Sequence, residues 1–234
     1  MSSGASFRGL IMSMKLFVEA ITKFLLGVVL VGLLIFWPAG TFAYFHGWLF
    51  MGILFVPMFF AGIVMMYKNP SLLISRLDAK EKQKDQDLVI KLSGLMFLAG
   101  FIVAGLGVRF QWHLLSKNMS VIFAVIFMIG YLLYAEVLRE NTYLSRTIEV
   151  QENQKVIDTG LYGIVRHPMY TVTLLLFLSM PLVLGSVYSF VIFLVYPFII
   201  AKRIKGEEAF LEKELPGYIE YKKKVKYRMI PFVW

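Results

Sequence analysis

Residues 171–201 read TVTLLLFLSMPLVLGSVYSFVIFLVYPFIIA, an uncharged run that is too long for one upright membrane span. As a continuous helix it would measure about 46 Å at ~1.5 Å per residue, whereas the hydrocarbon core of a bilayer is about 30 Å thick. Pro181 and the Gly185-Ser186 pair interrupt its middle and favour a turn there. The run therefore predicts a hairpin of two short helices, over roughly 171–184 and 187–201. A single tilted, kinked helix is the alternative.

Four further apolar runs precede this one, over roughly 16–37, 46–67, 88–109 and 118–137. Each is long enough to cross a bilayer, which takes about 20 mostly apolar residues. The 234-residue chain is 59% hydrophobic, and its mean hydropathy is +0.71. These features predict an all-α integral membrane protein with about four full transmembrane helices, the C-terminal hairpin and amphipathic interfacial helices in the tail, 202–234.

The pattern divides the chain into two parts. Residues 1–135 form the N-terminal transmembrane helices, and residues 136–234 form a core with the hairpin and a polar tail. Within the tail, Pro216-Gly217 predicts a break between one interfacial helix and a second short helix. The first apolar run lacks a small-residue cleavage site, so we expect it to be a retained helix.

The net charge of +9 favours a membrane surface over a nucleic acid as the partner. Lysines and arginines gather in 68–91, 138–170 and the tail, while 38–45 has none. The positive-inside rule places these basic segments in the cytoplasm, where anionic lipid headgroups attract them. Aromatic-plus-basic nucleic-acid signatures are absent. We expect a multi-pass protein of a prokaryotic plasma membrane with both termini in the cytoplasm.

Two residue types narrow the chemistry further. The chain contains no cysteine, which excludes disulfides, thiolate nucleophiles and thiolate metal sites. Its three histidines, His46, His113 and His167, are too scattered for a metal-binding motif of the HExxH type. No metal site is therefore predicted.

The segment GLYGIVRHPMYTV, residues 160–172, concentrates polar groups where the hairpin begins. Pro168 suits the first turn of a helix, which places His167 at the N-cap. Arg166 supplies a planar cation that pairs well with a carboxylate or phosphate. A capped helix start with an arginine reaching the interface is the structural alternative.

Further charged residues follow or precede the hairpin. Arg203 and Glu207 are four residues apart, the spacing of a helix surface pair. The adjacent Glu208 adds a second carboxylate. Glu136 and Glu140 lie at the end of the fourth span, where an ionisable group is a functional candidate. For Glu136 and Glu140, pairing with Arg139 or with the next loop is the alternative.

The order of these motifs is more specific than any one of them. GLYGIVRHPMY, an apolar hairpin and then RIKGEEAFLEKELPGYIEYKKKVKYRMIP resemble the isoprenylcysteine carboxyl methyltransferase family over roughly 136–234. Phospholipid N-methyltransferases are more distant relatives with the same kind of core. The resemblance implies a membrane enzyme that takes S-adenosylmethionine from the cytosol and a lipid-like acceptor from the bilayer. An isoprenoid-linked carboxylate is the acceptor that it implies first.

The resemblance also implies roles for individual residues. The residues that would hold the cofactor are Gly160, Leu161, Tyr162, Gly163, His167, Tyr170, Glu207 and Glu208. Arg166 and Arg203 would meet the acceptor's carboxylate or phosphate, and Glu208 would complete the catalytic group. For an amine acceptor, Glu136, Glu208 or His167 would be the candidate base. The chain departs from the family at Val172, where many members have glycine.

Two other readings stay open at this point. A membrane reductase that uses NADPH, of the sterol-reductase type, shares a related C-terminal core with an RHP-like motif, although such enzymes usually have longer chains. A non-catalytic scaffold on the same fold is the other. Titration with S-adenosylmethionine, its demethylated product and NADPH would separate these classes.

Overall fold

The computed structural model describes residues 3–77, 87–112, 114–144 and 148–234. The regular secondary structure within these ranges is helical, and the β-pairing among the described residues is an isolated bridge between Leu114 and Ser186. His113 and the middle of the basic 68–91 loop lie outside the described residues. The predicted all-α class is confirmed.

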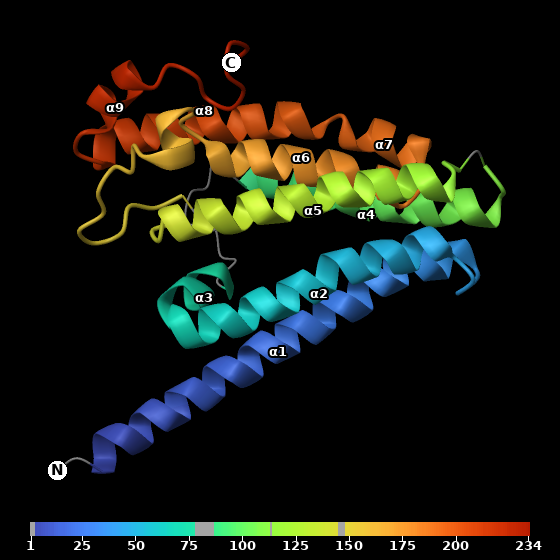
Figure 1. Cartoon of the computed structure of the whole chain (residues 1–234), viewed down its shortest axis with the longest axis horizontal. Helices are drawn as coiled ribbons and strands as arrows, with labels where there is room; N and C mark the ends of the chain where they lie inside the picture. Colours follow the sequence, from blue (N-terminus) through green and yellow to red (C-terminus); the bar gives the residue numbers. More distant parts are fainter. Residues whose placement is uncertain (1–2, 78–86, 113, 145–147) are drawn as a thin grey trace.

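Four long helices match the four predicted spans. They are α1 (Ser3–Ala39), α2 (Phe45–Lys68), α4 (Asp87–Arg109) and α5 (Lys117–Glu140). Together with Val187–Glu214, they are the five helical segments of the described chain that are long and apolar enough to cross a membrane. Figure 1 shows α2 returning along α1. Helix α4 packs against α1 as well as against the C-terminal helices, and α5 packs along the first of these.

The long apolar run folds as a hairpin. Helix α6 (Pro168–Val183) forms its first arm, and α7 (Val187–Phe193) followed by α8 (Tyr196–Glu214) forms its second. Both arms pack side by side in Figure 1. The hairpin prediction is confirmed, and the alternative of a single kinked helix is wrong.

Glycine 185 ends the first arm. Its φ of 73° is left-handed, a conformation that glycine adopts without a Cβ penalty. Its amide donates to the Leu182 carbonyl (3.1 Å), and the Ser186 amide donates to the Pro181 carbonyl (2.9 Å). This pair of bonds is a common way to close the last turn of a helix.

Groups from other loops hold the hairpin turn in place. The Tyr44 hydroxyl donates to the Leu184 carbonyl (2.5 Å), and the Leu115 amide donates to the Gly185 carbonyl (2.8 Å). His46 packs so closely on Gly185 that an added Cβ would lie 3.0 Å from the imidazole. The turn carbonyls are thus satisfied without water, as buried backbone requires.

The second arm is longer than predicted. The expected boundary near residue 201 is wrong, because α8 continues without a break to Glu214 and carries Lys202, Arg203 and the two glutamates with it. The interruption lies earlier, at Leu194-Val195, and Pro197 fits the first turn of α8. The first part of the tail is therefore a continuation of the hairpin.

The segment after α2 holds a short helix that was predicted as loop. Helix α3 (Pro70–Leu77) begins after Asn69, whose side-chain oxygen accepts from the Leu72 amide (3.1 Å). An asparagine followed by proline is a recognisable helix start, so the sequence carried this signal.

The predicted break in the tail is confirmed. The chain turns at Gly217, with φ 85°, into α9 (Tyr218–Lys224). Beyond α9 the chain runs back to the start of α6. Leu215, Tyr218, Tyr221 and Val225 form a small hydrophobic cluster of their own, separate from the main core between the long helices.

Candidate functional site

The start of α6 is held against the returning tail. The backbone amides of Arg166 and His167 donate to the carbonyls of Tyr227 (2.9 Å) and Arg228 (2.8 Å). The Thr171 hydroxyl donates to the Met229 carbonyl (2.8 Å). Pro168 occupies the first turn of α6 with His167 as its N-cap, as predicted. The motif and the tail thus form one folded unit.

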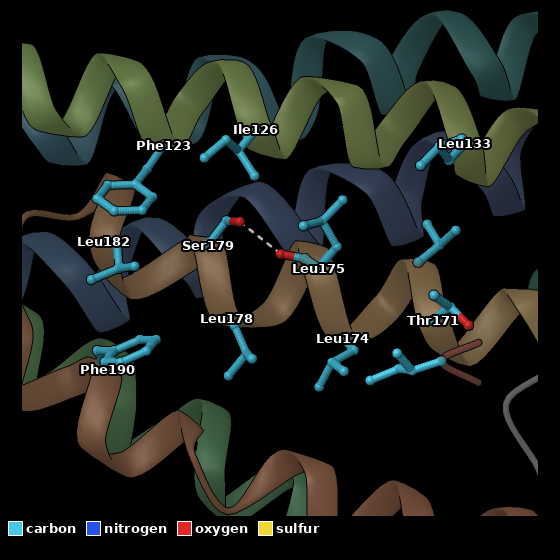
Figure 2. Close-up of a pocket in the computed structure, with 12 residues that line it drawn as sticks. Phe123, Ile126, Leu133, Thr171, Leu174, Leu175, Leu178, Ser179, Leu182 and Phe190 are labelled. Carbon is cyan, nitrogen blue, oxygen red and sulfur yellow. Dashed lines mark hydrogen bonds between the residues drawn. The ribbon is translucent and has the colours of Figure 1, made fainter. Parts of the chain in front are cut away.

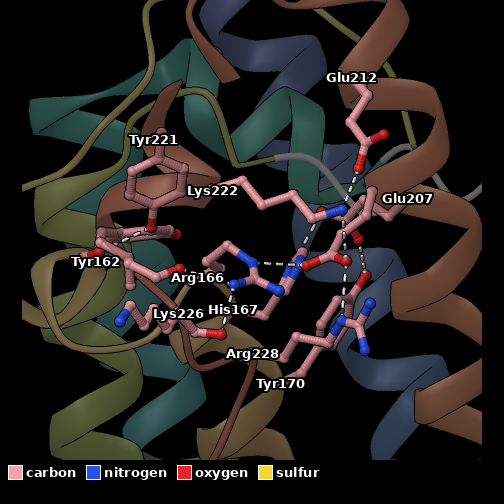
Figure 3. Close-up of polar contacts among 12 residues, drawn as sticks. Tyr162, Arg166, His167, Tyr170, Glu207, Glu212, Tyr221, Lys222, Lys226 and Arg228 are labelled. Carbon is pink, nitrogen blue, oxygen red and sulfur yellow. Dashed lines mark hydrogen bonds and ion pairs between the residues drawn. The ribbon is translucent and has the colours of Figure 1, made fainter. Parts of the chain in front are cut away.

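Glu208 lies at the centre of this unit. Its side chain is 3% exposed and accepts hydrogen bonds from Arg166 Nε (2.7 Å), His167 Nε2 (3.2 Å) and Arg228 Nε (2.9 Å). Figure 3 shows these three side chains converging. Lys222 is an additional neighbour, with its Nζ 4.0 Å from the Glu208 carboxylate. A carboxylate this deeply buried is stable only with such partners.

Arg166 is tied in several directions at once. Besides Glu208, its Nη1 donates to the carbonyls of Val225 and Lys226, both at 2.7 Å. Its side chain is 5% exposed. The guanidinium therefore joins α8, the motif and the tail, and in this arrangement its partners belong to the protein.

Glu207 is placed differently from its neighbour. It accepts a hydrogen bond from the Tyr170 hydroxyl and lies 3.8 Å from His167 Nδ1. Its side chain is 23% exposed. The Tyr170 hydroxyl in turn accepts from Arg203 Nε (3.0 Å). A chain of contacts thus links Arg203, Tyr170, Glu207 and His167, on the more open side of the cluster.

The turn before the motif is fixed by Glu140. Gly160 opens the short helix η2 (Gly160–Gly163) with a φ of 50°. The Glu140 carboxylate accepts from the Thr159 hydroxyl (3.0 Å) and the Leu161 amide (3.1 Å). A Cβ on Gly160 would lie 2.1 Å from this carboxylate and would sit on a left-handed backbone, so a larger residue would strain the turn and displace Glu140 from its donors.

Tyr162 and Tyr221 join this turn to α9. The buried Tyr162 accepts from Asn141 Nδ2 (3.1 Å), and its carbonyl accepts from the Tyr221 hydroxyl (2.7 Å). Burial raises the pKa of Tyr221 above its ordinary value, so the hydroxyl stays protonated and can donate. At the surface, Lys224 lies 2.6 Å from Asp158 and lowers the pKa of that carboxyl.

For Glu136, the structure shows the alternative of pairing with Arg139. It pairs with Arg139 (2.6 Å) on the exposed face of α5, with 43% and 72% of the two side chains accessible. Exposed pairs of this kind add little stability. Of the two glutamates near the end of α5, Glu140 is the one that contacts the site.

Arg228 is the site residue that sequence reasoning missed. It lies in the basic tail, which was expected only to meet anionic lipid headgroups. The structure instead places its guanidinium on Glu208, 5.1 Å from the centre of the Trp234 ring. Its spacing from the motif carried no signal, because the contact arises only when the chain returns after α9.

An apolar groove runs between α5 and α6 and ends beside this unit. Its volume is about 450 Å³, within the ~300–1,000 Å³ usual for ligand sites. Its lining residues are Phe123, Ile126, Leu133, Thr171, Val172, Leu174, Leu175, Leu178, Ser179, Leu182, Phe190 and Ile230. In Figure 2 the lining residues of α6 extend from Thr171 to Leu182, a length of about 17 Å for a helix. Phe123, Ile126 and Leu133 come from α5.

The lining of the groove is apolar. Both hydroxyls that line it are bonded internally, Ser179 to the Leu175 carbonyl (2.7 Å) and Thr171 to the Met229 carbonyl (2.8 Å). Val172, where the resembling family often has glycine, is one of the lining residues. The groove is suited to a hydrocarbon chain.

Comparison with known families agrees with the resemblance seen in the sequence. Residues 119–216 match the family model described as phospholipid methyltransferase. The matched segment starts in α5, includes the hairpin with His167 and Tyr170, and extends past Glu207 and Glu208 to the end of α8. A comparison with curated proteins found no match.

Proposed function

We propose that this chain, which carries a domain of the phospholipid methyltransferase family over residues 119–216, moves a methyl group from S-adenosylmethionine to a lipid-like acceptor. The observation that carries the proposal is the position of the polar cluster at the end of the apolar groove. Thr171 and Ile230 line that end, next to Tyr170 and to the tail segment that holds the motif. An acceptor whose chain lies in the groove would bring its head group to the cluster.

The residues present fit the proposed cofactor. When bound, S-adenosylmethionine supplies a methyl group on a cationic sulfonium, and a nearby carboxylate favours such a cation by direct attraction. Glu207 offers this carboxylate, because it is partly exposed and its partners are Tyr170 and His167. Glu208 has its charge compensated by two arginines. We therefore assign the electrostatic role to Glu207 and a supporting role to Glu208.

The other cofactor contacts follow the family resemblance. His167 and Tyr170, with the backbone of Gly160–Gly163, form the proposed wall of the site, and Glu140 and Tyr221 hold that wall in position. Rigid placement matters because methyl transfer is an in-line displacement. Aligning donor and acceptor can contribute about 7–11 kcal/mol of the lowering of the barrier. The apolar groove would also exclude water from the reacting atoms.

We assign the acceptor as an isoprenoid-linked carboxylate. Such a group is already ionised at neutral pH, so no base has to remove a proton before transfer. Arg203, one turn before Glu207 on α8, is the cation proposed to face it. Arg166 has a supporting role in the site, because Glu208 and two tail carbonyls bind its guanidinium.

A transfer assay tests both the reaction and the acceptor class. Purified protein in lipid vesicles would receive methyl-labelled S-adenosylmethionine with either an S-isoprenylated cysteine or phosphatidylethanolamine. We expect label in the isoprenylated product as a methyl ester, which releases methanol on treatment with base. Base-stable label in the phospholipid would contradict the carboxylate assignment and indicate N-methylation. Absence of label with both acceptors would contradict the proposed transfer to these lipids.

A pair of tryptophan variants tests the groove. Leu178→Trp fills part of the groove, and Leu132→Trp adds the same bulk at a 69% exposed position of α5 outside it. Displacing about two methylene groups from the groove costs ~1.6 kcal/mol, or more than tenfold in kcat/KM. We expect this loss for Leu178→Trp only, with unchanged cofactor affinity. Equal activity of the two variants would exclude the groove as the acceptor site.

A further inference from the structure

The hydroxyl of Tyr218 is buried without a hydrogen-bond partner among the residues that the structure describes. The residue as a whole is 4% exposed. Buried polar groups in folded proteins are nearly always paired, because leaving one unpaired forfeits its hydration. The nearby Tyr221 shows the usual pattern, since its hydroxyl donates to the Tyr162 carbonyl.

The position of Tyr218 is set by local structure. It is the first residue of α9, directly after the left-handed Gly217. Its ring packs on Tyr221, with centroids 5.8 Å apart. Through Tyr221 it adjoins the turn of Gly160–Gly163, which is the proposed cofactor wall. The side chain is therefore fixed at the border between the small tail cluster and the site.

Charged residues of the site act on this hydroxyl. Burial is the main cause of the raised pKa of Tyr218. The carboxylates of Glu208 and Glu207 raise this pKa further, and the Arg166 guanidinium lowers it. The phenol thus stays neutral and can both donate and accept a hydrogen bond. Around the ring lie apolar side chains of the tail cluster, including Val150, Val156 and Leu211.

We propose that Tyr218 is a further cofactor-binding residue, whose hydroxyl hydrogen-bonds a ribose hydroxyl of S-adenosylmethionine. A neutral group that donates and accepts matches a ribose hydroxyl, whereas the adjacent carboxylates disfavour the cofactor's own carboxylate at this place. The apolar surroundings of the ring suit the nucleoside. This assignment rests on the proposed function.

Two phenylalanine variants separate ligand binding from folding. Tyr218→Phe removes a hydroxyl that makes no bond to the described part of the protein, so the melting temperature of ligand-free protein should stay equal or rise. Tyr221→Phe leaves the Tyr162 carbonyl without its donor, so that melting temperature should fall. For Tyr218→Phe we expect calorimetry to show about 3- to 10-fold weaker binding of S-adenosylhomocysteine, the size of one hydrogen bond.

A nucleoside probe tests the ribose assignment. 5′-Methylthioadenosine keeps the ribose and lacks the amino-acid portion, so Tyr218→Phe should weaken its binding by the same factor. A loss confined to S-adenosylhomocysteine would overturn the ribose contact. Unchanged affinity for both, or a lower melting temperature of ligand-free Tyr218→Phe, would overturn the proposal as a whole. Wild-type protein that binds neither probe would overturn the proposed function itself, and this inference with it.

Discussion

At Glu208 an almost fully buried carboxylate accepts hydrogen bonds from Arg166, Arg228 and His167. Removing one charge from such a group leaves the others uncompensated in a poorly solvated place. The neighbouring Glu207 has a partly exposed side chain and contacts Tyr170 and His167. Two adjacent acids on one helix thus face different environments, and their variants should separate stability from binding.

We expect Glu208→Gln to lower the free energy of unfolding by about 3 kcal/mol, because two arginines lose their counter-charge. Glu207→Gln should leave stability nearly unchanged and weaken S-adenosylmethionine binding roughly tenfold, because the attraction to the sulfonium is lost. Thermal unfolding and calorimetry of both variants measure the two effects. A stable Glu208→Gln protein, or unaltered cofactor binding by Glu207→Gln, would contradict this division of roles.

Gly160 is the residue whose replacement should disturb the turn most. A Cβ there meets the Glu140 carboxylate at 2.1 Å, and φ is 50°. We expect Gly160→Ala to lower the melting temperature and to expose the 140–163 segment to protease. Gly94→Ala is the control, since nothing lies within 4 Å of its Cβ position on α4. Equal melting temperatures for the two variants would refute the requirement for glycine at residue 160.

At the scale of elements, the tail is held by contacts that depend on Arg166. Its guanidinium bonds Glu208 on α8 and the carbonyls of Val225 and Lys226 after α9. The adjacent amides add the backbone bonds to Tyr227 and Arg228. Without the guanidinium, the carbonyls of Val225 and Lys226 lose their donor, and fewer bonds remain to hold a segment rich in lysine.

Arg166→Ala should therefore loosen the tail, at a cost of about 3–5 kcal/mol, because the buried Glu208 carboxylate loses one of its partners and two tail carbonyls lose their donor. Limited proteolysis with trypsin should then cut at Lys222–Lys226 well before the rest of the chain. Arg139→Ala, which removes an exposed partner of Glu136, should change stability by less than ~1 kcal/mol. Tail cleavage at the same rate in both variants would show that Arg166 does not hold the tail.

At the scale of the whole molecule, Figure 1 places α3, α9, the motif and the start of α1 toward one end, and the hairpin turn toward the other. The described parts of the basic segments belong to the first end, which we propose is cytoplasmic. The chain contains no cysteine, so single-cysteine variants can be labelled without background.

Ala43→Cys and Lys213→Cys test this orientation from the two ends. Both positions are exposed. A membrane-impermeant maleimide should label Ala43→Cys on intact cells and should label Lys213→Cys only after the cells are permeabilised. The reverse pattern would invert the proposed topology and place the cofactor site outside the cytosol.

Much of this architecture could be predicted because its signals are local. The lengths of the apolar runs, Pro181 and Gly185 predicted four spans and a hairpin, and Pro168 predicted the start of α6. The length of α8 could not be read from its charged residues, because Glu208 is stabilised by arginines distant in sequence. Arg228 and Tyr218 were missed for the same reason, since their places depend on the path of the tail after Gly217.

The most direct test of the central claim is a binding titration of the purified full chain with S-adenosylmethionine, S-adenosylhomocysteine and NADPH, followed by calorimetry and thermal unfolding. The account predicts saturable binding of the first two with a higher melting temperature, weakened in Glu207→Gln, and no stabilisation by NADPH. Stabilisation by NADPH alone would contradict it in favour of a reductase. No response to any of the three would contradict it in favour of a non-catalytic role.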